Sequence, residues 1–275
     1  MGKALAGNLA PKGLSVAVYD LVEEAIRAVE ETGARAVGGP GEVGAEAEVI
    51  GVCVPADSHV RDVLMGADGV FAHAAQGTVV CIHSTVHPET VAEMSKAGAE
   101  HGVDVLEVPV AGGPLRAAEG NAFYMVAGDE GAFEKARPYL DAAASKVLYA
   151  GELGNASKLK LAVNVLTNLS FAAALEACEL AKAMGLPQEL FEEAGQETTM
   201  LNPLLLQYLS SKKMPKDALR SDPMQAHLRG RMEIAQKDLS LALEMALASG
   251  ISMPVTGLVT QNAARVYGVD DDGLR

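Results

Sequence analysis

Short runs of apolar and β-branched residues recur along the first 150 positions of the chain. They comprise residues 15–19, 49–54, 78–83, 103–108, 122–127 and 146–150. Residues 22–33 and 88–102, which lie between such runs, place apolar side chains at helical spacing, and both segments end in glycine, a common helix stop. This alternation of strands and helices is typical of βαβ units. It predicts an α/β domain built on a doubly wound sheet.

The pattern changes after Gly154. Residues 156–185 form one continuous segment that is long enough for about 45 Å of helix. A helix that is apolar on nearly every side must be covered by other helices or by a partner subunit, and residues 187–196 and 231–250 also have helical spacing. We therefore expect two domains in the 275 residues, an α/β domain over residues 1–154 and an all-helical domain over residues 155–275.

The charge and the cysteine content restrict the partners and the compartment. The formal net charge is −14, and such an acidic surface repels nucleic acid and anionic lipid, so we expect neither as a partner. Cys53, Cys81 and Cys178 are scattered and form no CxxC pair, which is typical of reduced thiols. The first residues also lack the apolar core of a signal peptide. These features predict a cytoplasmic protein.

The longest apolar stretch covers residues 161–175. It is interrupted by Asn164, Thr167, Asn168 and Ser170, and it is shorter than the about 20 residues that a bilayer requires. We expect no membrane span.

Gly2 and Asp20 have the spacing of two parts of a dinucleotide-binding fingerprint. A Rossmann-type domain carries G-x-G-x-x-G after its first strand, and an acid about 20 residues further on binds the ribose hydroxyls. Gly2 and Asp20 are eighteen positions apart, and Asp20 follows the strand at 15–19. An acid with no arginine beside it repels a 2′-phosphate, which favours NAD over NADP. Alternatively, Gly2 has no special role and Asp20 is a solvated strand end.

The first strand of such a domain and the first two glycines of its loop do not precede Gly2. We expect that the start of the chain was assigned downstream, at the Met of a G-x-G-x-M-G loop, and that about ten residues are missing. Without them, the pyrophosphate would lose its backbone donors and a helix terminus, so a protein that keeps the fold as a non-catalytic scaffold is one alternative function.

Three further motifs occur in a characteristic order: HSTVHPET at 83–90, EVPVAGGPLRAAEGNAF at 107–123 and GELGNASKLKLAVN at 151–164. With them, the chain resembles the β-hydroxyacid dehydrogenases, a family that includes 3-hydroxyisobutyrate dehydrogenase and tartronate semialdehyde reductase. The resemblance covers essentially the whole chain. It implies a Rossmann-type domain followed by a helical domain, and hydride transfer between a nicotinamide cofactor and a small 3-hydroxy acid or its semialdehyde.

The second motif is similar to the family's substrate loop, D-x-P-V-S-G-G followed by A-x-x-G. Glu107 stands where the family has aspartate, and Ala111 stands where it has a serine that helps to hold the substrate carboxylate. The backbone N–H groups of Gly112 and Gly113 can still approach an anion closely. The resemblance therefore implies a substrate loop that includes Ala111, Gly112 and Gly113, although a simple turn between a strand and a helix would have the same composition.

The third motif matches the family's G-x-x-G-x-G-x-x-x-K-x-x-x-N, with Ala156 in place of the third glycine. Lys160 and Asn164 are four residues apart, so a helix places both on one face, whereas the residue four after Lys158 is Ala162. A partly desolvated lysine can exchange the proton of an alkoxide or hydroxyl. We expect Lys160 to be the catalytic residue and Asn164 to orient either the substrate or the ammonium group. The alternative is an ordinary surface lysine.

Other candidate residues lie at strand ends and on a late helix. Ser84 and Thr85 follow the strand at 78–83, at the edge of the sheet where doubly wound folds bind ligands. The resemblance implies that Thr85 contacts the cofactor and Ser84 the substrate, although both residues are also suitable caps for a helix that starts at Pro88. Similarly, Val54 and Pro55 end the strand at 49–54, and the resemblance places them against the cofactor.

The pair Lys237 and Asp238 matches a K-D-L motif of the same family. The resemblance implies that Lys237 contacts the cofactor and Asp238 the substrate, although an exposed charge pair on an amphipathic helix would look the same. His83 and His87 lack the spacing of metal ligands, so no metal site is predicted. The expected assembly is a homodimer or homotetramer. An imine reductase is a further alternative function, but such relatives generally replace the catalytic lysine, which this chain keeps.

Overall fold

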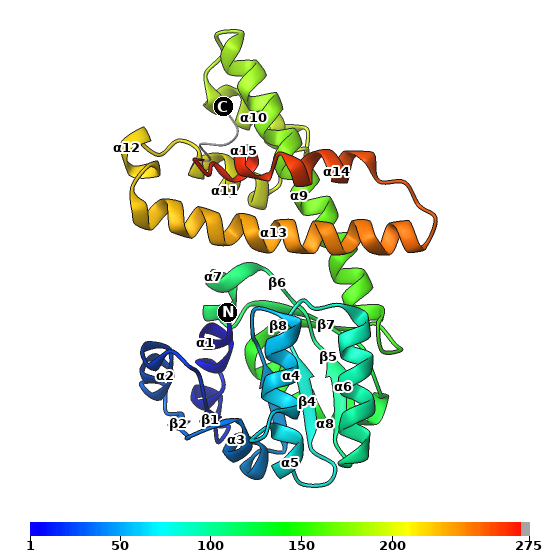
Figure 1. Cartoon of the computed structure of the whole chain (residues 1–275). Helices are drawn as coiled ribbons and strands as arrows, with labels where there is room; N and C mark the ends of the chain where they lie inside the picture. Colours follow the sequence, from blue (N-terminus) through cyan, green and yellow to red (C-terminus); the bar gives the residue numbers. More distant parts are fainter. Residues whose placement is uncertain (271–275) are drawn as a thin grey trace. The chain divides into compact units, whose positions relative to one another are not determined.

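The computed structural model describes residues 1–270, apart from the side chain of residue 216, and separates into two compact units (Figure 1). The first unit covers residues 1–160 and the second begins at Leu161. The division falls within a long helix, α9. The Rossmann-type α/β domain and the helical domain expected from the sequence are both present.

The strands of the first unit form three hydrogen-bonded groups. β1 pairs with β2 in parallel, β3, β4 and β5 form a parallel sheet in that order, and β7 pairs with β6 in antiparallel and with β8 in parallel orientation. A bridge between Glu107 and Ala127 connects β5 to β7. The bounds are Ala17–Val18 (β1), Arg35–Ala36 (β2), Val49–Val52 (β3), Val79–Ile82 (β4), Asp104–Glu107 (β5), Val110–Ala111 (β6), Ala122–Val126 (β7) and Ala144–Tyr149 (β8).

Strand β4 shows how both faces of this sheet are covered. All four of its residues are buried, and successive side chains point to opposite faces. Val79 and Cys81 belong to a core formed with α1, α7 and α8, whereas Val80 and Ile82 belong to a core formed with α4, α5 and α6. A strand buried on both faces explains why residues 79–82 are apolar without alternation.

Eight α-helices are described in the first unit before α9, and a short 3-10 helix, Ala10–Lys12, follows the first of them. They are Gly2–Ala6 (α1), Glu23–Glu30 (α2), Pro40–Glu46 (α3), Asp57–Met65 (α4), Val70–His73 (α5), Pro88–Glu100 (α6), Gly113–Ala118 (α7) and Glu130–Ala143 (α8). The segments expected at 22–33 and 88–102 correspond to α2 and α6.

The helical unit is built on α9 and α13. A common core contains residues from α9, α11, α13 and α15, among them Phe171, Leu209 and Met232. α13 starts earlier than the sequence pattern at 231–250 suggested, because Pro223 and Gly230 weaken the helical signal of its first part. The bounds are Asn155–Ala183 (α9), Gln188–Glu197 (α10), Pro203–Ser211 (α11), Lys216–Leu219 (α12), Asp222–Ala248 (α13), Pro254–Gln261 (α14) and Ala263–Tyr267 (α15).

α9 is long and apolar enough to cross a membrane by length and composition alone. Its most apolar 18-residue window has a mean hydropathy of 1.4, and 33% of that window is buried within the protein. The polar residues between 161 and 175 therefore do not make the helix too polar to cross a membrane, contrary to our expectation. Core helices and helices at subunit interfaces have the same composition.

Candidate active site

Burial separates the two lysines at the start of α9. The side chain of Lys160 is only 8% exposed, whereas Lys158 is exposed and its Nζ lies 3.5 Å from Asn155 Oδ1. Lysine is rarely this deeply buried, because removing an ammonium group from water is costly. The burial and the helical register agree in making Lys160, rather than Lys158, the candidate for chemistry.

A buried carboxylate holds the first turn of α9. Glu107, at the end of β5, is 1% exposed. Its Oε2 accepts hydrogen bonds from the backbone N–H groups of Gly154 (2.8 Å) and Ala156 (3.2 Å), and its Oε1 accepts one from Ser157 Oγ (2.8 Å). The first N–H groups of a helix have no partner within the helix and carry partial positive charge, so an acid there is strongly stabilising.

The contact of Glu107 with the first turn of α9 was not predicted from the sequence. The sequence showed Glu107 only as a replacement for aspartate in the substrate loop, and 47 positions separate it from Gly154. Gly154 itself adopts a φ of +95°, in the left-handed region that favours glycine. Together, Glu107 and Gly154 determine where α9 begins and therefore where Lys160 projects.

The expected substrate loop has the backbone conformation that its glycines permit. Gly112 and Gly113, at the start of α7, have φ values of +106° and +76°. Side chains other than glycine rarely adopt these conformations. Ala111 is half-buried in β6, where it pairs with Phe123. Without a hydroxyl at 111, the polar groups that this part of the loop can offer an anion belong to its backbone.

Asn8 fastens the substrate loop to the N-terminal helical region. Its Nδ2 donates hydrogen bonds of 2.7 Å to the carbonyl oxygens of Ala4 and Ala117. The first acceptor lies on α1 and the second on α7. The helix that follows the double glycine is therefore anchored to α1.

Ser84 ties together the loops that follow β3 and β4. Its Oγ donates to the carbonyl oxygen of Val54 (2.7 Å) and accepts from the backbone N–H of Val54 (2.8 Å). Ser84 is buried and Thr85 is half-buried, while Pro55 is exposed. Because the hydroxyl proton of Ser84 is already donated to protein, its direct effect is to align these two strand ends.

His87, rather than Ser84 or Thr85, is the N-cap of α6. The helix starts at Pro88 as expected, and His87 Nδ1 accepts a hydrogen bond from the backbone N–H of Glu89 (3.2 Å). The alternative interpretation of Ser84 and Thr85 as helix caps is therefore wrong, because both residues lie too far before the first turn of the helix.

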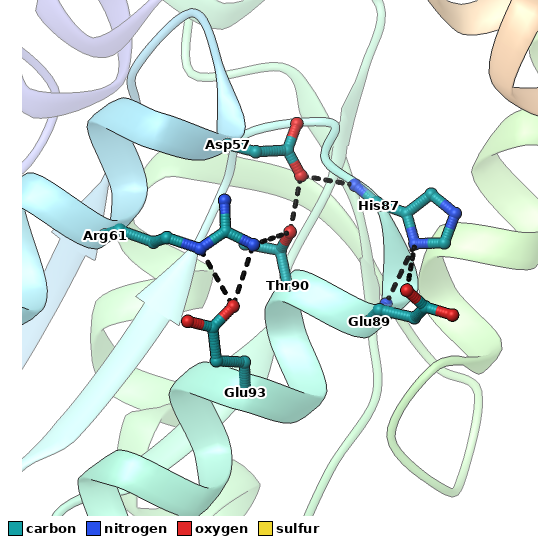
Figure 2. Close-up of polar contacts among 6 residues, drawn as sticks. All are labelled: Asp57, Arg61, His87, Glu89, Thr90 and Glu93. Atoms are coloured by element: carbon teal, nitrogen blue, oxygen red, sulfur yellow. Dashed lines mark hydrogen bonds and ion pairs between the residues drawn. The ribbon is translucent and has the colours of Figure 1, made fainter.

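A polar cluster holds the His87 end of this loop (Figure 2). Asp57 Oδ1 accepts hydrogen bonds from the backbone N–H of His87 (2.9 Å) and from Thr90 Oγ1 (2.6 Å). Arg61 on α4 donates to Thr90 Oγ1 (3.1 Å) and pairs with Glu93 on α6 (2.7 Å). The loop that carries Ser84 and Thr85 is thus held at one end by Val54 and at the other by Asp57.

Replacing Asp57 by alanine should lower the free energy of unfolding by about 2 kcal/mol, because two hydrogen bonds to one carboxylate oxygen are lost. Urea unfolding measures this change. Asp62→Ala is the matched control, since Asp62 is exposed on the same helix. Equal effects of the two substitutions would contradict the role given to Asp57.

Gly2 lies at a close contact between two segments, and Asp20 is exposed after a strand. A Cβ atom at position 2 would lie only 3.3 Å from Cys53 Cβ, so glycine allows α1 to pack closely against the loop after β3. Asp20 is exposed beyond the end of β1, and its Oδ1 accepts from the backbone N–H of Val22 (2.9 Å). One carboxylate oxygen thus shapes the turn into α2.

In the helical unit, Asn164 is hydrogen-bonded to Asp238. Asn164 Nδ2 on α9 donates to Asp238 Oδ2 on α13 at 2.6 Å, and Lys237 Nζ lies 3.0 Å from Asp238 Oδ1. Asp238 is 3% exposed, so the pair Lys237 and Asp238 is not an ordinary exposed charge pair. Asp238, which was expected to contact the substrate, therefore has one carboxylate oxygen already hydrogen-bonded to Asn164.

The first histidine of the first motif, His83, has both ring nitrogens in contact with other protein groups. His83 is buried, with Nδ1 3.0 Å from the carbonyl oxygen of Val108 and Nε2 2.7 Å from Tyr139 Oη. Burial lowers the pKa of His83 to about 4, so the ring is neutral near neutral pH. Among the described residues, no group of three or more His, Cys, Asp or Glu side chains could hold a metal ion.

Two family models match nearly the whole chain. Residues 1–151 match the NAD binding domain of 6-phosphogluconate dehydrogenase. Residues 154–273 match a domain described as the NAD-binding domain of NADP-dependent 3-hydroxyisobutyrate dehydrogenase. The two matches meet close to the start of α9.

Individual relatives are similar over most of their length. The 2-(hydroxymethyl)glutarate dehydrogenase of Eubacterium barkeri is 31% identical over 95% of this chain and 84% of its own. The NAD-dependent L-serine dehydrogenase of Pseudomonas aeruginosa is 32% identical over 94% of this chain and 86% of its own. The crystal structure of a 3-hydroxyisobutyrate dehydrogenase from Salmonella typhimurium superposes with a TM-score of 0.81 at 26% identity, covering 96% of this chain and 90% of that one.

Proposed function

The chain belongs to the β-hydroxyacid dehydrogenase family, and from this premise we propose that it interconverts a small 3-hydroxy acid and its semialdehyde with a nicotinamide cofactor. The observation that carries the proposal is Lys160, a buried lysine on a helix whose first turn is held by the carboxylate of Glu107. A lysine removed from water can act as both proton donor and proton acceptor.

Each residue of the site would have a defined task. A bound nicotinamide would accept or supply the hydride. In the oxidation direction, Lys160 Nζ takes the proton of the substrate hydroxyl, and in the reduction direction it returns a proton to the alkoxide oxygen. The backbone N–H groups of Gly112 and Gly113 hold the substrate carboxylate, and Ala111 adds no side-chain hydroxyl to them. Ser84 keeps the neighbouring loop in place.

The residues present fit a dinucleotide along the carboxyl ends of the strands. Gly2 gives α1 the close approach that the third glycine of the fingerprint provides elsewhere. Val54, Pro55 and Thr85 would line the cofactor, and Lys237 would contact it. Asp20 would accept hydrogen bonds from the ribose hydroxyls through the carboxylate oxygen that does not shape the turn. Its charge favours NAD over NADP.

The exposed apolar side chains of α9 favour self-association. Leu166 and Leu180 are each at least 60% exposed, and a second copy of this helix would cover them. We therefore propose a homodimer or homotetramer. The reduced state of Cys53, Cys81 and Cys178 and the need for a nicotinamide pool favour a cytoplasmic location.

A panel of 3-hydroxy acids with NAD and NADP, followed by the absorbance of the reduced cofactor, tests the function. We expect turnover of at least one short-chain 3-hydroxy acid. We also expect kcat/KM to be about tenfold or more higher with NAD, because placing a phosphate beside Asp20 costs more than about 1.4 kcal/mol.

Other outcomes of the panel would identify the alternatives. A chain that neither binds NADH nor turns over any acid would be a non-catalytic scaffold. Reduction of cyclic imines without any activity on hydroxy acids would indicate an imine reductase.

A further inference from the structure

The hydrogen bond between Asn164 and Asp238 fixes which way the amide of Asn164 points. The nitrogen and oxygen of an amide are nearly the same size, so their positions are inferred from their partners. An ionised carboxylate can only accept a hydrogen bond. The 2.6 Å contact with Asp238 Oδ2 therefore requires the nitrogen of Asn164 to face α13. The carbonyl oxygen, Oδ1, points away from Asp238.

A second set of contacts fixes the backbone at the same position. Asn168 Nδ2 donates to the carbonyl oxygen of Asn164 (2.8 Å), and Asn168 Oδ1 accepts from Tyr267 Oη on α15 (2.7 Å). Asn168 and Tyr267 are both buried. The side chain of Asn164 is thus oriented by a residue of α13. Its backbone carbonyl is bound by Asn168, which is itself hydrogen-bonded to Tyr267 of α15. An acceptor held from two helices is pre-organised for a ligand.

The surroundings of Asp238 support its role as an acceptor. The Lys237 ammonium group lies 3.0 Å from Asp238 Oδ1 and offsets the charge of the buried carboxylate. Oδ1 nevertheless accepts no hydrogen bond of normal geometry from the described residues. The group of α13 that contacts the Asn164 amide is therefore a hydrogen-bond acceptor.

We propose that Asp238 is a positioning residue that leaves Asn164 Oδ1 as a hydrogen-bond acceptor one helical turn from Lys160. The proposal rests on the function proposed above and sharpens it. Asn164 binds a donor, which is either the Lys160 ammonium group or the hydroxyl of the hydroxy acid. Asn164 Oδ1 cannot bind the substrate carboxylate, because both groups only accept hydrogen bonds. Asp238 acts through Asn164 and not by contact with the substrate.

Nuclear magnetic resonance of the full chain labelled with ¹⁵N-asparagine tests the orientation without any activity measurement. The Asn164 side-chain amide, assigned with Asn164→Ala, should show one proton shifted downfield and slow to exchange, as expected for a donor to a carboxylate. Asp238→Asn should move this resonance. Glu233→Gln, an exposed carboxylate-to-amide change on the same helix, should not. A resonance that is identical in wild type and Asp238→Asn would overturn the proposal.

Steady-state kinetics test whether the loss of this positioning slows the reaction. Asp238→Asn should lower kcat about tenfold or more, by a larger factor than it changes the dissociation constant of NADH, because a misplaced acceptor acts first on the reacting geometry. Asp238→Glu, which keeps the charge, should recover part of the loss, and Glu233→Gln should behave as wild type. An Asp238→Asn variant that melts as wild type does and turns over at the wild-type rate would overturn the proposal.

Binding to Asn164→Ala distinguishes the two donors. If the substrate hydroxyl is the donor, the hydroxy acid binds more weakly than to wild type, while the acid without the hydroxyl binds equally. If the Lys160 ammonium group is the donor, each acid binds to Asn164→Ala as tightly as to wild type, and only kcat falls. If both acids lose affinity to the same extent, Asn164 holds the carboxylate and the proposal is wrong. A wild-type rate in Lys160→Ala would refute the proposed function, whereas the amide resonance would still report on Asp238.

Discussion

Lys160→Ala is expected to lower turnover by about a hundredfold or more while NADH still binds with wild-type affinity. The substitution removes the only group proposed to move the proton. Hydride transfer alone would leave an alkoxide or require loss of a hydroxyl proton to water, and either route is slow near neutral pH. Steady-state kinetics with a turned-over acid from the panel, together with NADH titration, measure the two quantities separately.

Matched variants make this result specific to Lys160. Lys158→Ala removes an exposed lysine two positions away on the same helix and should leave turnover unchanged. Lys160→Met keeps most of the buried side-chain volume, so its loss of activity would not be due to a cavity. Turnover that persists in both Lys160 variants would remove this residue from the mechanism.

The strands of the sheet centre were predictable because burial on both faces produces long apolar runs. Residues 78–83 and 103–108 contain β4 and β5, whose pairing is regular. By contrast, β2 and β6 have two residues each, too few for any periodicity to be visible. The antiparallel pairing of β6 with β7 also differs from a simple succession of βαβ units. The connection between the two strands contains Gly112 and α7.

Sequence reasoning could propose candidate site residues where they share one helix or one loop. Spacing alone placed Lys160 and Asn164 on one face and excluded Lys158, and the burial of Lys160 agrees with that choice. Contacts between distant segments gave no sequence signal. Asp238 is 74 positions from Asn164 and Glu107 is 47 from Gly154. A motif search sees an acid at each position but not the hydrogen-bond donors that surround it.

Glu107→Ala should be among the most destabilising single substitutions in the α/β unit, lowering the free energy of unfolding by about 3 kcal/mol or more. It would leave the backbone N–H groups of Gly154 and Ala156 and the hydroxyl of Ser157 buried without an acceptor. Glu107→Gln should cost less, since one oxygen remains, but its NH₂ group would face a donor. Glu107→Asp keeps the charge on a side chain one methylene shorter and should cost least. Urea unfolding monitored by circular dichroism gives the order.

The same variants connect stability to catalysis, because Glu107 holds the turn from which Lys160 projects. Glu107→Gln should therefore lower kcat even at temperatures where the chain remains fully folded, with NADH binding unchanged. Glu48→Ala is the control, since Glu48 is an exposed glutamate that precedes β3, and it should change neither the urea midpoint nor kcat. If Glu107→Gln were as stable and as active as Glu48→Ala, the carboxylate would not determine where α9 begins. The position of Lys160 would then depend on the packing of the helix alone.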